Sequence, residues 1–357
     1  MRGDSLIAAM RDGASVNQAA LNRIQFIFPK TFNVVCFSHT LDNVGNHFVI
    51  PNLTEFGNLW IRLFSQSHKA GLMWKELTGR KPKSYSETRW WSRWEVYKQL
   101  MEQFGDVQRF LDDMVREKVA PQTSRQLADF FADLNKVISL KLELAALIDV
   151  GEVFVKATYV LEGDGPLVLS CFETLQGVCN ACQNVHLPNV HAVAVAIVDA
   201  DPAQNVAALE QETKRSVQPA IEWFLRTFNV ELHDTLSTFK AARIMCPVTV
   251  QWLRPTPANV EALRQFPFLD SNDVINDLVT EMPNYLAAAQ DVIMAYEEDK
   301  VKWWRQQSDN LPHWSSAVMK VLLVQPSSAA AERVFTILTH RSMIHKSMLS
   351  WTIYRLV

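Results

Sequence analysis

The segment SLIAAMRDGASVNQAALNRIQFIFPKTFNVVCF, residues 5–37, holds nearly all of the β-strand signal in the chain. Residues 5–11 are mostly apolar and stop at Asp12, which predicts a short strand that ends in an acidic turn. Ser15 can then cap a helix whose apolar residues recur at helical spacing. Residues 32–37 are rich in valine and phenylalanine, as buried strands of parallel sheets are. The segment therefore predicts strand, helix and a second, parallel strand.

The rest of the chain has helical spacing. From residue 39 to about residue 304, apolar residues recur every three or four positions. Glycine supplies only 11 of the 357 residues, which disfavours disordered and turn-rich all-β classes. We expect loops at 161–166, 185–203 and 253–257, and a helix that starts after Pro326. The predicted fold class is mostly α with a small α/β part.

The chain has no overall positive charge that would attract nucleic acid or an anionic membrane to its whole surface. The chain has 35 Lys and Arg residues against 38 Asp and Glu, a formal net charge of −3. Five cysteines, an odd number, fit a reducing compartment better than a disulfide framework. No signal peptide and no apolar run of 18 residues is recognisable. We therefore expect an intracellular, soluble protein with no membrane partner.

One region departs from this acidic average. Residues 61–100 contain nine basic residues against three glutamates, with seven large aromatic residues interleaved. Positive charge suits phosphates and flat rings suit unstacked bases, so the region is a candidate DNA contact. The alternative is that the tryptophans pack inward and the basic residues form a solvated face. The candidate DNA-binding residues are Lys81, Lys83, Arg89, Trp90 and Arg93.

Several motifs follow one another in a fixed order. They are Asp12 within MRDGASVN, CFSH at 36–39, TRWW at 88–91, Trp303-Trp304, Leu311-Pro312 and PSSAAAERVF at 326–335. This ordered set resembles the hAT superfamily of DNA transposases. In that family an RNase H-like domain supplies an Asp-Asp-Glu triad, a long helical insertion splits the domain before the glutamate, and the C-terminal segment supports dimerisation.

The resemblance implies a division of the chain and a set of site residues. Residues 1–66 would be a partial RNase H-like segment, 67–310 the all-α insertion, and 311–357 the dimerisation segment with the glutamate helix. Asp12 would be the second acidic residue and Glu332 the third, both catalytic and both ligands of Mg²⁺ or Mn²⁺ during DNA cleavage and strand transfer. Taken without the resemblance, Asp12 is a turn residue and Glu332 a favourable first-turn charge.

The length of the chain before Asp12 argues against catalysis. In the resembling family the first acidic residue lies on an earlier strand, and the intervening strands and helix need roughly 35 residues. Only 11 residues precede Asp12 here. We therefore expect an N-terminally truncated copy with an incomplete triad, which is inactive alone and would bind Mg²⁺ or Mn²⁺ only if the site were completed.

Two Cys/His clusters look like metal sites. Cys36 and His39 form a lone C-x-x-H, which cannot complete tetrahedral zinc, and in the resembling family this motif braces the active site. We expect the same structural role here. The second cluster, Cys179, Cys182, His186 and His191, has too short a spacer for a zinc finger. No zinc is expected.

The resemblance also implies partners and a location. It assigns Arg89 to a phosphate or acidic contact and Trp90 to stacking on a displaced base, so that unstacked or hairpin DNA ends are expected ligands. We expect self-association and a nuclear location. Two alternatives stay open. One is a protein-interaction module derived from a transposase without DNA binding, and the other is an unrelated helical scaffold in which the motif residues are scattered in space.

Overall fold

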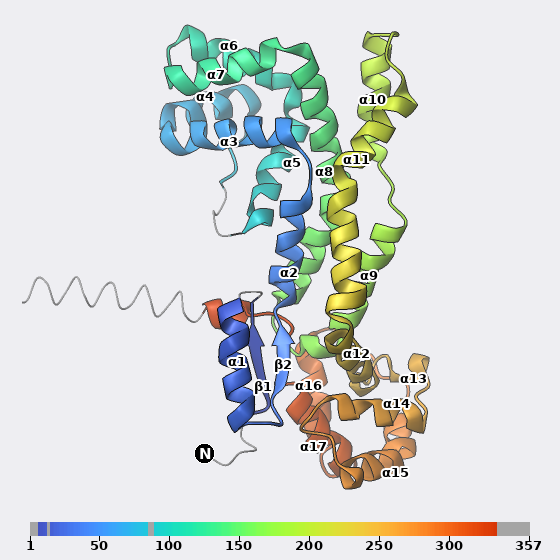
Figure 1. The fold of residues 1–357 in the computed structure, drawn as a ribbon. Helices are drawn as coiled ribbons and strands as arrows, with labels where there is room; N and C mark the ends of the chain where they lie inside the picture. The colour runs from blue at the N-terminus through green and yellow to red at the C-terminus, as the bar shows by residue number, and fades with distance from the viewer. Residues whose placement is uncertain (1–5, 13–14, 85–88, 334–357) are drawn as a thin grey trace, which may run out of the picture. The chain divides into compact units, whose positions relative to one another are not determined.

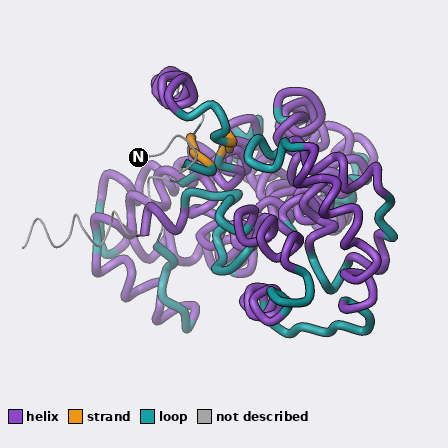
Figure 2. Tube along the Cα trace, turned by 90° about the horizontal axis from the view of Figure 1, so that it is seen from below, coloured by secondary structure: helices purple, strands orange, loops and turns teal. Residues whose placement is uncertain are grey.

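The computed structural model describes residues 6–12, 15–84 and 89–333 (Figure 1). This part of the chain is mostly helical, and its two short strands lie beside each other (Figure 2). The strands are β1 (Ala8–Arg11) and β2 (Phe32–Val35). The α-helices are α1 (Ser15–Ile27), α2 (Phe37–Val44), α3 (Pro51–Gln66), α4 (His68–Thr78), α5 (Trp94–Glu102), α6 (Val107–Arg116), α7 (Pro121–Ala132), α8 (Leu134–Leu161), α9 (Cys171–Gln183), α10 (Pro188–Ala200), α11 (Val206–Arg226), α12 (His233–Ala242), α13 (Val250–Leu253), α14 (Pro257–Glu261), α15 (Asn272–Ala288), α16 (Glu297–Gln306) and α17 (Pro312–Val321).

The sheet is the parallel pair that the sequence predicts. β1 pairs with β2 in parallel, with Ala8 opposite Phe32 and Arg11 opposite Val35, and α1 forms the connection (Figure 1). Because parallel strands end at the same edge, the residues that follow them are neighbours. The backbone N–H of Cys36 donates to the carbonyl of Arg11 at 2.8 Å. The topology therefore places the residue before Asp12 directly beside Cys36.

The described chain divides into two compact units. Unit 1 comprises residues 1–40, 157–177 and 228–357, and unit 2 comprises 41–156 and 178–227. Unit 1 therefore contains both the first strands and the last helices, which the sequence separates by more than 200 residues. The predicted three-part division, with boundaries at residues 66 and 310, separates segments by their family origin. The two compact units do not test that origin, so the division stays a prediction.

The core of unit 1 is aromatic. Phe32 of β2 packs edge-on against Phe266 at 5.3 Å, and Phe37 packs against Phe239 of α12 at 5.4 Å. A second cluster joins the fully buried Tyr285, Trp304 and Trp314, with ring centroids 4.7–4.9 Å from the tyrosine. Trp304 and Trp314 thus fill the core around α15–α17.

Unit 2 has its own aromatic core. Trp60 of α3 contacts Trp74 of α4 at 5.0 Å and Phe110 of α6 at 5.7 Å. Glu143 of α8 is buried beneath the start of α3, where its carboxylate accepts from the backbone N–H of Leu53 at 2.7 Å. A carboxylate in this position satisfies a donor that the helix cannot satisfy itself. The helical periodicity of residues 39–304 therefore corresponds to apolar side chains that are buried between helices.

The loop expected at 185–203 is wrong, because residues 188–200 form α10. Pro188 begins the helix at a position where its missing N–H costs nothing. The next two N–H groups, of Asn189 and Val190, donate to the carboxylate of Asp149, each at 3.1 Å. The cap comes from α8, about 40 residues earlier, so the local sequence carries no start signal.

None of the helices in the described ranges combines the length and the apolar character that crossing a membrane requires.

Candidate functional site

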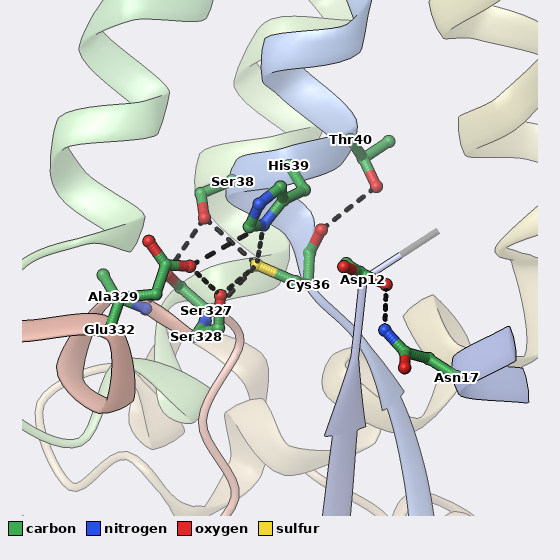
Figure 3. Close-up of polar contacts among 10 residues, drawn as sticks. All are labelled: Asp12, Asn17, Cys36, Ser38, His39, Thr40, Ser327, Ser328, Ala329 and Glu332. Atoms are coloured by element: carbon green, nitrogen blue, oxygen red, sulfur yellow. Dashed lines mark hydrogen bonds and ion pairs between the residues drawn. The ribbon is translucent and has the colours of Figure 1, made fainter. Parts of the chain in front are cut away.

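The carboxyl edge of the sheet carries a polar cluster centred on Cys36 (Figure 3). The Cys36 sulfur is fully buried and lies 3.1 Å from Nδ1 of His39, 3.1 Å from Oγ of Ser38 and 3.2 Å from Oγ of Ser328. The backbone N–H of Ser328 also donates to the sulfur at 3.3 Å. Ser38 in turn contacts Ser327, oxygen to oxygen at 3.0 Å. All five side chains come from the two motifs that the sequence singled out, at 36–39 and 326–335.

The contacts around the sulfur change its acidity. Burial by itself raises the pKa of the Cys36 thiol. The hydrogen bonds with His39, Ser328 and Ser38 and with the Ser328 N–H outweigh burial, so that the pKa falls from 9.0 to about 6. Each of these groups can donate a hydrogen bond to the charged form of the sulfur. The cluster therefore favours a thiolate at Cys36 and a hydrogen-bonded His39.

Glu332 belongs to the same cluster. Residues 329–333 are helical, and the N–H of Ala329 donates to Oγ of Ser327 at 3.1 Å, which caps the turn. Oγ of Ser328 donates to a carboxylate oxygen of Glu332 at 2.5 Å, and Nδ1 of His39 lies 4.0 Å from the same oxygen. The segment is also tied to the end of β2, because the N–H of Phe37 donates to the carbonyl of Pro326 at 2.9 Å. Glu332 is thus held at the carboxyl edge of the sheet.

Arg333 holds the turn from its other side. Its guanidinium donates to the carbonyl of Glu162 at 3.0 Å and to the carboxylate of Asp164 at 2.7 Å, within the predicted 161–166 loop. The turn that carries Glu332 is therefore fixed by contacts with two distant parts of unit 1.

Asp12 follows β1 at this edge and has a different partner. Its carboxylate accepts from the side-chain amide of Asn17 of α1 at 2.5 Å. In Figure 3 Asp12 and Glu332 lie on either side of Cys36, and no hydrogen bond or ion pair joins the two carboxylates. The structure therefore brings Cys36, His39 and Glu332 together, with Asp12 beside them at the end of the neighbouring strand.

These residues do not fit a divalent-metal site. Among residues 6–12, 15–84 and 89–333, no group of three or more His, Cys, Asp or Glu side chains is arranged to hold a metal ion. The two candidate carboxylates accept hydrogen bonds from Asn17 and Ser328, one oxygen of each being engaged. Metal binding by Asp12 and Glu332 therefore stays a prediction.

The candidate DNA-binding residues lie in unit 2, on the segment before α5. Gln99 of α5 holds the chain at Lys81 and Lys83, since it donates to the carbonyl of Lys81 and accepts from the N–H of Lys83, both at 2.8 Å. The ammonium of Lys83 lies 3.7 Å from the carboxylate of Glu95, and Arg80 pairs with Glu102 at 2.7 Å. Part of the positive charge of residues 61–100 is thus matched by neighbouring glutamates.

Trp90 and Trp91 pack against unit 2. Trp90 stacks on Phe48 with centroids 5.7 Å apart, and it lies against the short 3₁₀-helix Gly45–His47. Trp91 is buried, with its ring N–H donating to the carbonyl of Leu41 at 2.8 Å. Packing thus accounts for Trp91 fully and for one face of Trp90. Thr88, of the TRWW motif, lies outside the described residues.

The contact with Trp90 makes Gly45 intolerant of a side chain. A Cβ at residue 45 would lie 2.0 Å from Cδ2 of Trp90, so Gly45→Ala must displace the indole. We expect the free energy of unfolding, measured by urea denaturation, to fall by about 1–3 kcal/mol. The matched control is Gly177→Ala in α9, where a Cβ has no neighbour within 4 Å. That change should raise stability by roughly 0.5–1 kcal/mol, and equal effects of the two changes would contradict the prediction.

The second Cys/His cluster is dispersed. Cys179 and Cys182 are buried in α9, where burial and the neighbouring Cys179 raise the pKa of Cys182 to about 12. A thiol with a raised pKa is a poor zinc ligand, since zinc binds the thiolate. His191 lies instead 2.6 Å from the carboxylate of Glu210, and His186 is exposed.

The serine pair at 327–328 is the part of the site that sequence reasoning missed. The sequence places these residues only at the start of the helix after Pro326, although they supply three of the contacts that link residues 36–39 to the Glu332 turn. The available signal was two consecutive serines between Pro326 and the helix-forming AAAER run, because two hydroxyls exceed what one cap needs.

The comparisons with known proteins bear on the C-terminal part. Residues 281–350 match the family model described as the hAT family C-terminal dimerisation region, and no curated protein matches the chain. The match starts in α15 and includes α16 and α17, so it begins before the predicted boundary at 311. Residues 281–350 are therefore similar to the hAT family C-terminal dimerisation region, which confirms in this part of the chain the resemblance drawn from the sequence motifs.

Proposed function

We propose that this protein derives from a hAT transposase, self-associates through residues 281–350, contacts DNA through residues 81–93 and does not cleave DNA by itself. The match of residues 281–350 to the dimerisation region carries the proposal. The proposed location is the nucleus, where the DNA partner lies. The proposed ligands include unstacked and hairpin DNA ends.

The arrangement at the sheet edge supports a partial RNase H-like ancestry. Two parallel strands joined by a helix end at one edge, with an acidic residue after the first strand. A second acidic residue, Glu332, is carried to that edge from the far end of the chain by the contacts with Cys36 and Phe37. An unrelated scaffold would have no reason to gather these motif residues.

The proposal that cleavage is lost is supported by the state of the two carboxylates. Two-metal catalysis needs several carboxylate oxygens that converge on the ions. Asp12 and Glu332 instead accept hydrogen bonds from Asn17 and Ser328. Mg²⁺ or Mn²⁺ would be a cofactor only if a further acidic group completed the site.

One observation favours the second candidate, a protein-interaction module without DNA binding. Lys83 and Arg80 are paired with glutamates, and Trp90 stacks on Phe48. The contacts of Lys83 and Trp90 occupy groups that the DNA-binding proposal assigns to phosphate and base, and the Arg80 pair reduces the positive charge beside them. Exposed ion pairs contribute little, so a phosphate can still displace them, which leaves DNA binding as the first candidate.

Self-association is tested with the full chain by sedimentation at several concentrations. Ile293 and Leu323 are 93% and 65% exposed within residues 281–350, so Ile293→Asp and Leu323→Asp should weaken association if this region forms the interface. Val230, 70% exposed and outside the region, supplies the matched control Val230→Asp. A wild-type chain that is monomeric at all concentrations would defeat this part of the proposal.

DNA binding is tested by fluorescence anisotropy with a labelled hairpin oligonucleotide. Binding should weaken as salt rises, and Lys81→Gln with Lys83→Gln should lower the salt slope relative to Lys214→Gln, an exposed lysine of α11. Trp90→Ala should weaken binding to hairpins more than binding to blunt duplex. Salt-independent or absent binding would leave the interaction module as the function. Incubation of nicked and intact substrates with Mg²⁺ or Mn²⁺ should give no cleavage.

A further inference from the structure

Trp252, in the short helix α13 of unit 1, is an unusual surface residue. Its side chain is 85% exposed, whereas the tryptophans of the two cores, such as Trp74 and Trp304, are nearly inaccessible to solvent. Tryptophan is large and apolar, so an isolated exposed ring loses the free energy that burial would supply. The helix ends at Arg254, which adopts a φ of 42° and is also exposed. The chain therefore presents an indole and a guanidinium two residues apart on the surface.

A cavity of about 210 Å³ lies directly beside this helix. Its lining includes Leu253, the residue after Trp252, and the polar side chains of Ser237, Lys240, Arg243, Asn259 and Gln265. Lys240 and Arg243 lie over the ring of Phe172, at 5.7 and 5.2 Å from its centroid. These cation–π contacts hold both cations in place. The cavity beside Trp252 therefore carries fixed positive charge.

The ion pairs show which of these cations is available. Arg243 is paired with Glu173, and the nearby Glu261 is paired with Arg264. Asp234, at the start of α12, lies 3.3 Å from His233. Lys240 has no carboxylate within ion-pair distance in the described part of the chain. Lys240 and Arg254 can therefore bind an anionic group without first breaking an ion pair.

A second, larger cavity continues the first along α12. It has a volume of about 620 Å³ and shares Ser237 and Gln265 with the smaller one. Its other lining residues are mostly hydroxyl and amide side chains, among them Thr31, Asn33 and Thr238. Oδ1 of Asn33 is buried without a hydrogen-bond partner in the described chain. The two cavities together form an elongated polar groove, which we call the α12 groove.

We propose that the α12 groove binds a single strand of nucleic acid, with a base stacked on Trp252 and phosphates at Lys240 and Arg254. A stacking platform needs a free aromatic face, and a base offers its own face only when it is unstacked from its neighbours. The hydroxyl and amide groups of the larger cavity suit sugar and base edges, which are neutral and polar. An extended groove with cations in the smaller cavity and neutral polar groups in the larger one thus matches a strand better than a compact ligand. This inference goes beyond the contact proposed for residues 81–93 and does not depend on it.

The test is fluorescence anisotropy of the full chain with labelled oligo(dT) and oligo(rU). Trp252→Ala should weaken binding roughly 5- to 100-fold, the range for loss of one stacked base. Lys240→Ala should lower the salt slope by about 0.7, the value for one lost phosphate contact on a single strand. The matched controls are Phe26→Ala, which removes an aromatic ring that is 90% exposed in α1, and Lys214→Ala in α11. Both controls should bind as the wild type does.

The possible outcomes separate this proposal from its competitors. Weaker binding by Trp252→Ala supports the proposal. The oligonucleotide that the wild type binds more tightly then shows whether the ligand is DNA or RNA. Unchanged binding by Trp252→Ala overturns it, and so does a change in sedimentation with binding unaltered, which would make Trp252 a protein contact. The variants at Lys81, Lys83 and Trp90 test the contact proposed for residues 81–93 separately, because they do not alter the α12 groove. If those variants bind DNA as the wild type does while Trp252→Ala weakens binding, only the contact at residues 81–93 is rejected.

Discussion

Replacing Trp304 by alanine is expected to lower the free energy of unfolding by about 3–5 kcal/mol, the range for a buried tryptophan. Trp304 is fully buried against Tyr285, and its ring N–H donates to the carbonyl of Met245 at 3.0 Å. The substitution therefore leaves both a cavity and an acceptor without its donor. Because Trp304 lies within the residues that match the dimerisation region, the proposed self-association should weaken in parallel.

Denaturant unfolding followed by circular dichroism measures this effect. The matched control is Trp252→Ala, since Trp252 is 85% exposed and its loss should change stability by no more than about 0.5 kcal/mol. Trp304→Phe, which keeps a ring but loses the N–H, should fall between the two. Equal stability of the Trp304 and Trp252 variants would mean that the tryptophan cluster is not the core of this region.

The second large effect is a pH dependence from Cys36. Burial raises the pKa of this thiol, and the hydrogen bonds to His39, Ser328 and Ser38 more than offset it, which lowers the pKa from 9.0 to about 6. A depressed pKa means that the folded state favours the thiolate. This stabilisation is fully present above pH 9 and is lost as the pH falls through about 6.

The measurement compares wild type with Cys36→Ala in urea at a series of pH values. Between pH 9 and pH 6, the wild type should lose about 3 kcal/mol relative to the variant, because one pKa unit corresponds to about 1.36 kcal/mol. Cys182→Ala is the control, since the pKa of Cys182 is raised to about 12 and this thiol stays protonated throughout the range. Parallel curves for wild type and Cys36→Ala would show that folding does not lower the pKa of the Cys36 thiol.

The sequence predicts those parts of the fold whose signals are local. The apolar run before Asp12, the serine at 15 and the valine-rich residues 32–37 are short patterns, and β1, α1 and β2 appear where they indicate. The α10 helix was missed because its N–H groups are capped by Asp149 of α8. A cap supplied from another helix leaves no trace in neighbouring residues.

The site shows the same division between local and distant information. The order of the motifs was enough to select Cys36, His39 and Glu332, which the fold then places in one cluster. The serines at 327–328 were not recognised as partners of Cys36, because their role depends on a contact across the whole chain. The exposure of Trp252 was equally invisible, since QWLRPTP indicates a loop but not which side chain that loop presents.

The hydrogen bond between Cys36 and Ser328 joins residues 292 positions apart, and this separation has a consequence for biosynthesis. A ribosome releases the β1–α1–β2 segment first, yet the sulfur acquires its serine partners only after a further 292 residues have been translated. Until then the edge of the two-stranded sheet lacks its cover, and such long-range closure is slow. A nascent chain stalled before Pro326 should therefore expose this edge to chaperones, whereas release of the following few residues should hide it.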